Sequence, residues 1–239
     1  VMMGVFVNKN LLDDNNFDLE NYGFDYASGT IWTYEDMIRL ARDFTTRARS
    51  RYDNDFYYGI DGDWNNLNFA WALPAMDNPD WGMNSFDGGQ FNFTDPIYIN
   101  HYQREVDLFF EGVKNNVRLN TAGAQLEFGT ALPELFFTEG RVLLYSSYSW
   151  NFDQINLTTQ DLMFLPFPRG AAEDSVPRLP SAIGVLALAA DTAHPEEAYK
   201  LAKFMSWGEE GQRAKIRLYE EAGEHLTKFP VTDHDSVWN

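Results

Sequence analysis

The sequence predicts an α/β fold, because strand-like apolar runs alternate along the chain with amphipathic, helix-like segments. Residues Val142 to Tyr145 form a continuous apolar run, which is typical of a strand buried on both faces of a sheet. Between Tyr34 and about Arg47, apolar side chains recur at intervals of three and four residues, which is typical of a helix with one buried face. With 239 residues, 44% of them hydrophobic, the chain can bury the core of one large domain or two small ones.

The first quarter of the chain is predicted to contain a strand, a loop and a helix. Val1 to Val7 reads as the opening strand. Leu11 to Ser28 is rich in Asp and Asn, which predicts a loop with a helical turn. Thr33 is a natural N-cap for the helix from Tyr34, and Asp36 completes a pattern like a capping box.

The next segment is unusual in composition, since no Lys or Arg occurs from residue 52 to residue 103 while aromatic residues and Asp are frequent. Tyr57 to Ile60 predicts a short strand, and Leu67 to Ala75 predicts a helix. Phe91 to Phe93 is interpreted as an edge strand or hairpin. A long helix is predicted from Pro96, at its first position, to Asn115.

The second half is predicted to continue the alternation. A short helix over Leu132 to Phe136 ends near Gly140, a C-cap residue. Strands are predicted at Val142–Tyr145, Leu162–Leu165 and Ser181–Asp191, with a short helix or turn at Phe152–Ile155 and a loop from Pro166 to Pro180. Helices are predicted from Pro195, with Ala198, Leu201, Ala202 and Met205 as the buried face, and from Glu209 to Tyr219.

The strand at Val142–Tyr145 ends in hydroxyl and aromatic side chains, which suggests a ligand site. Ligands of open α/β sheets bind outside the carboxyl ends of the strands. Tyr148, Ser149 and Trp150 follow this end directly, and we expect them to contact a ligand. The alternative is that these residues are core and loop, since Tyr and Trp are often half-buried for packing alone.

Composition excludes several classes of function. The 36 acidic against 18 basic residues argue against nucleic acid and anionic membrane as partners, because both need clustered cations. The chain has no Cys and no apolar run of membrane-spanning length. Its four His lack metal-ligand spacing, and neither a nucleophile-elbow nor a Walker motif occurs. We therefore predict no catalytic residues, no metal, no cofactor and no insertion of this segment into the membrane.

Asp61, Asp63 and Asn65 alternate as in the first half of a calcium loop. The sixth position of that loop would be Asn66 rather than Gly, and the twelfth would be Ala72 rather than Glu. A polar loop is the simpler interpretation, so no calcium site is predicted.

The surplus of aromatic, Asn and Asp side chains fits a neutral sugar or polyol as ligand. Sugar rings present flat C–H faces to Trp and Tyr, and their hydroxyls need placed polar partners. On this interpretation Trp64 stacks on a sugar, while Asp63 and Asn65 bind its hydroxyls. The alternative is a large aromatic core with Trp64 as a loop anchor.

Seven short segments extend the prediction. They are Val5–Leu12, Trp32–Met37, Leu135–Val142, Ser147–Trp150, Leu165–Gly170, Ile183–Ala190 and Pro195–Gln212. In this order they resemble the extracytoplasmic solute-binding proteins of ABC importers, the sugar-binding family that includes maltose-binding protein. Val7 stands where that family usually has Tyr, and a loop is inserted before Trp32.

The resemblance implies a periplasmic-binding-protein-like fold of two lobes that close on a sugar by hinge motion. Residues 1–165 would form the second lobe, and residues 166–239 the hinge return strand and helices of the first lobe. The opening part of the first lobe would be missing, together with a Cys for lipid anchoring. The implied location is extracytoplasmic, and the implied partners are a small carbohydrate and the transmembrane subunits of an ABC permease.

Two other functions stay open on the sequence alone. The clamp could bind a non-sugar ligand such as a polyol phosphate or a peptide, although the cation-free segment from 52 to 103 disfavours phosphate. A carbohydrate-active enzyme would need two carboxylates facing each other across an aromatic cleft.

Overall fold

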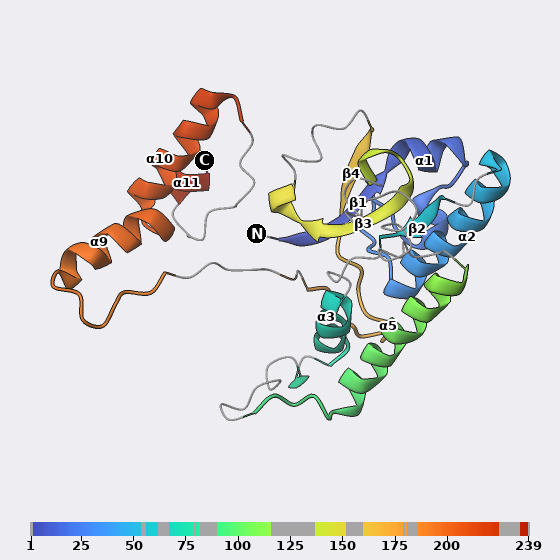
Figure 1. Cartoon of the computed structure of the whole chain (residues 1–239), viewed down its shortest axis with the longest axis horizontal. Helices are drawn as coiled ribbons and strands as arrows, with labels where there is room; N and C mark the ends of the chain where they lie inside the picture. Colours follow the sequence, from blue (N-terminus) through green and yellow to red (C-terminus); the bar gives the residue numbers. More distant parts are fainter. Residues whose placement is uncertain are drawn as a thin grey trace. The chain divides into compact units, whose positions relative to one another are not determined.

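The computed structural model describes residues 2–53, 56–61, 67–78, 80–81, 90–115, 137–151, 160–178, 180, 186–224 and 235–238 (Figure 1). The chain divides into two compact units. The sheet unit comprises Met2–Tyr148 and Ile155–Pro180, and the helical unit comprises Ser149–Gln154 and Ser181–Asn239. The predicted α/β class is confirmed, since the sheet unit combines a four-stranded sheet with helices.

The sheet has the strand order β2-β3-β1-β4. Its strands are β1 (Met3–Asn8), β2 (Tyr58–Ile60), β3 (Val142–Tyr148) and β4 (Leu162–Pro166). β1 lies between β3 and β4 and is antiparallel to both, whereas β2 pairs with β3 in parallel. The carboxyl ends of β2, β3 and β4 therefore lie at one edge of the sheet. The strands predicted at Val1–Val7, Tyr57–Ile60, Val142–Tyr145 and Leu162–Leu165 are confirmed in position.

The helices of the sheet unit are α1 (Lys9–Asp14), the 3-10 helix η1 (Leu19–Tyr22), α2 (Tyr34–Tyr52), α3 (Leu67–Asp77) and α5 (Pro96–Asn115). Thr33 caps α2 in a capping box with Asp36, as predicted, and the helix continues past Arg47 to Tyr52. None of the helices among the described residues is long and apolar enough to cross a membrane.

Helix α1 replaces part of the predicted loop. The Asn8 side chain caps it by accepting a hydrogen bond from the Leu11 N–H at 3.1 Å. Leu11 and Leu12 are buried. Six residues are too few for an apolar period to stand out, so the acidic and amide side chains around α1 suggested a loop instead.

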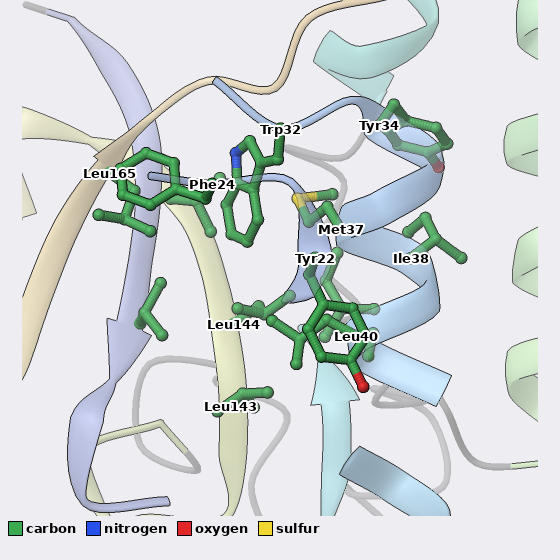
Figure 2. Close-up of a cluster of buried hydrophobic side chains, with 14 of the residues drawn as sticks. Tyr22, Phe24, Trp32, Tyr34, Met37, Ile38, Leu40, Leu143, Leu144 and Leu165 are labelled. Atoms are coloured by element: carbon green, nitrogen blue, oxygen red, sulfur yellow. The ribbon is translucent and has the colours of Figure 1, made fainter. Parts of the chain in front are cut away.

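The core of the sheet unit lies between α2 and the sheet. Met37 and Leu40 point from α2 toward the sheet, where Leu144 of β3 lies (Figure 2). The apolar face predicted for this helix is fully buried. Gly59 of β2 allows the close approach of the two layers, because a Cβ there would lie 2.1 Å from the Ala41 carbonyl oxygen.

Phe91–Phe93, interpreted as an edge strand or hairpin, does not form a strand, because Phe91 forms an isolated bridge and Phe93 lies in a turn. The predicted helix over Leu132 to Phe136 and the turn at Phe152–Ile155 lie outside the described residues. Gly140 has the left-handed φ of 72° that suits its predicted capping role, and its N–H donates to the Phe137 carbonyl at 3.0 Å.

The helical unit contains α9 (Pro195–Ser206), α10 (Glu209–Ala222) and α11 (Asp235–Trp238), together with the 3-10 helix η3 (Ser149–Asn151). Both long helices were predicted, and they are confirmed, but the buried face predicted for α9 is wrong for two of its residues. Ala202 is buried, whereas Leu201 and Met205 are 60% and 64% exposed. The apolar stripe is present, but the described part of this unit supplies nothing that covers it.

The strand predicted at Ser181–Asp191 is wrong over residues 186–191, which form neither helix nor strand. Leu186 and Leu188 are exposed there. A strand needs a partner for its backbone hydrogen bonds, and no strand among the described residues pairs with this segment.

Candidate ligand-binding edge

The carboxyl ends of β2 and β3 form the candidate site. Their parallel register pairs Tyr58 with Val142 and Ile60 with Leu144. Asp61, the residue after β2, donates its N–H to the Leu144 carbonyl at 2.9 Å. The chain thus leaves both strands at the same edge, where ligands of α/β sheets commonly bind.

The buried carboxylate of Asp61 ties the two strand ends together. Its Oδ1 accepts hydrogen bonds from the Ser146 N–H at 3.0 Å and from the Ser146 hydroxyl at 3.2 Å. Neither Asp61 nor Ser146 has exposed surface. The sequence analysis considered Asp61 only as the start of a calcium loop. The position of Asp61 was a usable sequence signal, because it directly follows a short apolar strand. A carboxylate that is buried there needs a hydrogen-bond partner.

The predicted contact residues after β3 lie in consecutive positions. Tyr148 is the last residue of β3, pairs with Met3 of β1 and is half-buried against the core of the sheet unit. Ser149 and Trp150 begin η3, which belongs to the helical unit. Ser149 is buried, and Trp150 is 42% exposed. An aromatic side chain with this much exposed surface can contact a ligand.

The other three predicted contact residues, Asp63, Trp64 and Asn65, lie outside the described residues. In the sequence they fall between Asp61, at the carboxyl end of β2, and Leu67, where α3 begins. The contact of these three residues with a ligand stays a prediction.

The loop after β4 is fastened to α3 and α5 by a buried polar group. Asp77, at the end of α3, accepts hydrogen bonds from the Ala171 N–H at 3.3 Å and the Ala172 N–H at 3.1 Å. His101 Nε2 of α5 lies 3.1 Å from Asp77 Oδ2, the oxygen that also accepts from the Ala171 N–H. The Arg104 guanidinium lies 3.4 Å from His101 Nδ1 and pairs with Glu35 of α2.

These contacts favour the neutral form of His101. Nε2 donates to the Asp77 carboxylate, which leaves Nδ1 as the acceptor facing the Arg104 guanidinium. Burial lowers the pKa of His101 below its ordinary value, and the charge of Arg104 lowers this pKa further. Asp77 opposes both effects but does not reverse them.

We expect the stability of the sheet unit to fall with pH below about 6.5 through His101. The unfolded chain binds a proton at this residue more tightly than the folded chain does. The free energy of unfolding is therefore retained above the unfolded pKa and decreases as pH falls below it, by at most about 1.4 kcal/mol per pH unit for one proton. Urea unfolding of the wild type and of His101→Gln at pH 7.5 and 5.0 measures the difference.

The Gln side chain can still donate to Asp77 but does not titrate. His101→Gln should therefore lose less stability between the two pH values than the wild type loses. Equal losses in both proteins would show that His101 does not titrate differently on folding.

Among the described residues at this edge, Tyr148 and Trp150 present aromatic surface, whereas Asp61, Ser146 and Ser149 are buried. His101 bonds to Asp77 rather than to a serine. Among the described residues, no cluster of three or more His, Asp or Glu side chains is arranged to hold a metal ion.

Comparisons with known proteins place the chain in a structural context. A family model described as bacterial extracellular solute-binding protein matches residues 2–206. The comparison with curated proteins found no match.

Three solved structures share the fold at low sequence identity. The ABC substrate-binding protein Lmo0181 from Listeria monocytogenes, in complex with cycloalternan, is 19% identical, with a TM-score of 0.63 over 99% of this chain and 52% of its own. A solute-binding protein from Thermotoga lettingae, bound with alpha-D-tagatose, is 15% identical, with a TM-score of 0.56 over 95% of this chain and 52% of its own. A cyclo/maltodextrin-binding protein complexed with maltotetraose is 17% identical, with a TM-score of 0.54 over 95% of this chain and 50% of its own. The chain spans about half the length of each.

Proposed function

The chain belongs to the bacterial extracellular solute-binding protein family, and from this premise we propose that it binds a neutral sugar or oligosaccharide and delivers it to an ABC permease. The location outside the cytoplasm follows from the family, and we include a lipid anchor in the proposal. The ligands of the three structural relatives, which are cycloalternan, tagatose and maltotetraose, support carbohydrate as the ligand class.

The observation that carries the proposal is the shared edge of β2 and β3. Asp61 and Ser146 hold the two strand ends together inside the protein. Polar and aromatic residues follow at 61–66 after β2, and β3 ends in Tyr148 with Ser149 and Trp150 directly after it. A sugar needs this combination of rigid support, aromatic faces and hydroxyl partners.

We assign the following roles to the proposed contact residues. Tyr148, Trp150 and Trp64 stack on the apolar faces of sugar rings. Asp63 and Asn65 form hydrogen bonds with sugar hydroxyls. Ser149, which was also predicted as a contact, is buried and is assigned no direct contact with the sugar. Each ring contributes about 1 kcal/mol beyond its area burial, by analogy with aromatic pairs.

Charge supports a neutral ligand over a phosphorylated one. The 52 residues from 52 to 103 contain no Lys or Arg, and the chain carries a formal net charge of −18. A phosphate at this edge would need cations or a helix N-terminus to offset its charge. A neutral sugar needs neither.

We further propose that residues 1–165 form the second lobe of a two-lobed receptor, and that residues 166–239 supply the hinge return strand and helices to the first lobe. Ligand binding would close the lobes by a hinge motion, without covalent chemistry. This chain covers 52% of the length of each of two solved relatives, which supports the proposal that it contains part of a two-lobed receptor.

A thermal-shift panel on the complete gene product tests the proposal. Neutral mono- and oligosaccharides are compared with their phosphorylated forms and with short peptides. A ligand that binds only the folded state raises stability by about 2.7 kcal/mol at one hundred times its Kd, so a specific sugar should raise Tm by several degrees. A shift with peptides or phosphorylated polyols alone would contradict the assignment to neutral sugars.

A further inference from the structure

A second group of aromatic side chains lies on α3, on residues 80–81 and 90–93, and on the first turns of α5. These elements follow one another along one side of the sheet unit, and α3 packs against α5 (Figure 1). We call the group the α3–α5 aromatic surface. Its members are Trp71, Trp81, Phe91, Phe93, Tyr98 and Tyr102.

Four of these side chains are unusually exposed for their size. Trp71 is 41% exposed, Phe91 53%, Phe93 42% and Tyr102 44%. Single exposed aromatics are common, but exposed rings gathered on one surface indicate a binding function.

The rings hold one another in place. Buried Trp81 stacks on Tyr98 with centroids 5.6 Å apart, and its Nε1–H donates to the Asn92 carbonyl at 3.2 Å. Phe91 and Phe93 are stacked at 5.1 Å, with their planes 7° apart. Trp71 meets Phe93 edge-on at 5.5 Å. A ligand would therefore find the rings already oriented, which reduces the entropy lost on binding.

The charge around this surface favours a neutral ligand. No Lys or Arg occurs between residues 52 and 103, while Asp80 and Asp95 flank the ring-bearing segments. The first cation on α5, Arg104, is paired with Glu35 and lies over the Tyr34 ring. Nucleic acids and anionic lipid surfaces need clustered cations and would be repelled here.

We propose that the α3–α5 aromatic surface is a second carbohydrate-binding surface, which holds a neutral polysaccharide chain. Exposed rings can stack on the C–H faces of successive sugar units, and the acidic surroundings do not oppose an uncharged polymer. This surface is built from other residues than the edge at β2 and β3, and it takes a different ligand, a polymer instead of a transported sugar. Its role would be to keep the protein close to the polymer.

Affinity electrophoresis tests this proposal. The complete gene product is run in native gels that contain soluble starch, dextran or barley β-glucan, and its retardation is measured against polymer concentration. At least one polymer should retard the wild type. Trp71→Ala and Phe91→Ala should each weaken the apparent affinity about tenfold, which corresponds to the larger aromatic stacking contributions. Trp71→Phe, which keeps a ring, should weaken it less.

Tyr26→Ala is the matched control, because Tyr26, at 89%, is the most exposed aromatic among the residues that the structure describes and lies in a different loop. Tyr26→Ala should be retarded like the wild type. Circular dichroism establishes that each variant folds, and if Trp71→Ala does not, Phe91→Ala decides, since its ring is the more exposed.

Two results would overturn the proposal. One is equal migration of the wild type with and without each polymer. The other is retardation that survives both Trp71→Ala and Phe91→Ala but is lost in Trp150→Ala, since the polymer would then bind at the strand ends. Failure here leaves the thermal-shift result with small sugars unaffected, so the two proposals fail independently.

Discussion

Replacing Trp32 with Ala lowers the free energy of unfolding of the sheet unit by about 3–5 kcal/mol, the usual cost of removing a buried Trp. The side chain has no exposed surface. Its ring meets the edge of Phe24 with centroids 5.8 Å apart, and its Nε1–H points to the Pro166 carbonyl at 3.4 Å. Trp32 fills the space where the segment before α2 crosses the sheet, close to Met37 (Figure 2).

Urea unfolding followed by circular dichroism measures this loss. Trp32→Phe, which retains a ring, should lose less than Trp32→Ala. Tyr26→Ala serves as the surface control and should stay within about 0.5 kcal/mol of the wild type. A loss below about 1 kcal/mol for Trp32→Ala would mean that this side chain is not part of the folded core.

Replacing Asp61 with Ala lowers the free energy of unfolding by about 2–3 kcal/mol and also weakens sugar binding. The change leaves the buried N–H and hydroxyl of Ser146 without the acceptor that they have in the wild type. An unsatisfied buried donor costs about 1–3 kcal/mol, and the lost hydrogen bonds involved a charged group. The ends of β2 and β3 lose their link, so the residues after them lose their support.

Urea unfolding gives the stability of this variant, and calorimetric titration gives its affinity for the sugar found in the thermal-shift panel. Asp61→Asn keeps an oxygen acceptor and should be less affected on both measures. Asp174→Ala removes an exposed carboxylate from a loop of the same unit and should change neither. If Asp61→Ala kept full affinity, the edge of the sheet would not position the ligand.

Nearby residues were sufficient to predict α2 and β3 from the sequence. The cap at Thr33 and the apolar face of α2 are both encoded within a few residues of each other, and the structure has both. The run from Val142 to Tyr145 needed no partner to be recognised as buried. For these segments, propensity, capping and periodicity all indicate the same structure.

Elements that depend on a distant or absent partner were predicted less well. The apolar stripe of α9 was read correctly, but Leu201 and Met205 are exposed because burial needs an opposing surface that periodicity does not reveal. Residues 186–191 have strand-like composition without a ladder partner among the described strands. The bond from Ser146 to Asp61 joins residues 85 apart in sequence, so only the parallel pairing of β2 and β3 reveals it.

Calorimetric titration of the complete gene product and of its Trp150→Ala and Tyr148→Ala variants tests the central claim most directly. The titrant is the neutral sugar that gives the largest thermal shift, and Tyr26→Ala is the control. We expect wild-type binding with a single stoichiometry, an affinity weakened about tenfold or more in each of the two variants, and no change in the control. Unchanged affinity in both Trp150→Ala and Tyr148→Ala would contradict the assignment of the ligand to the end of β3.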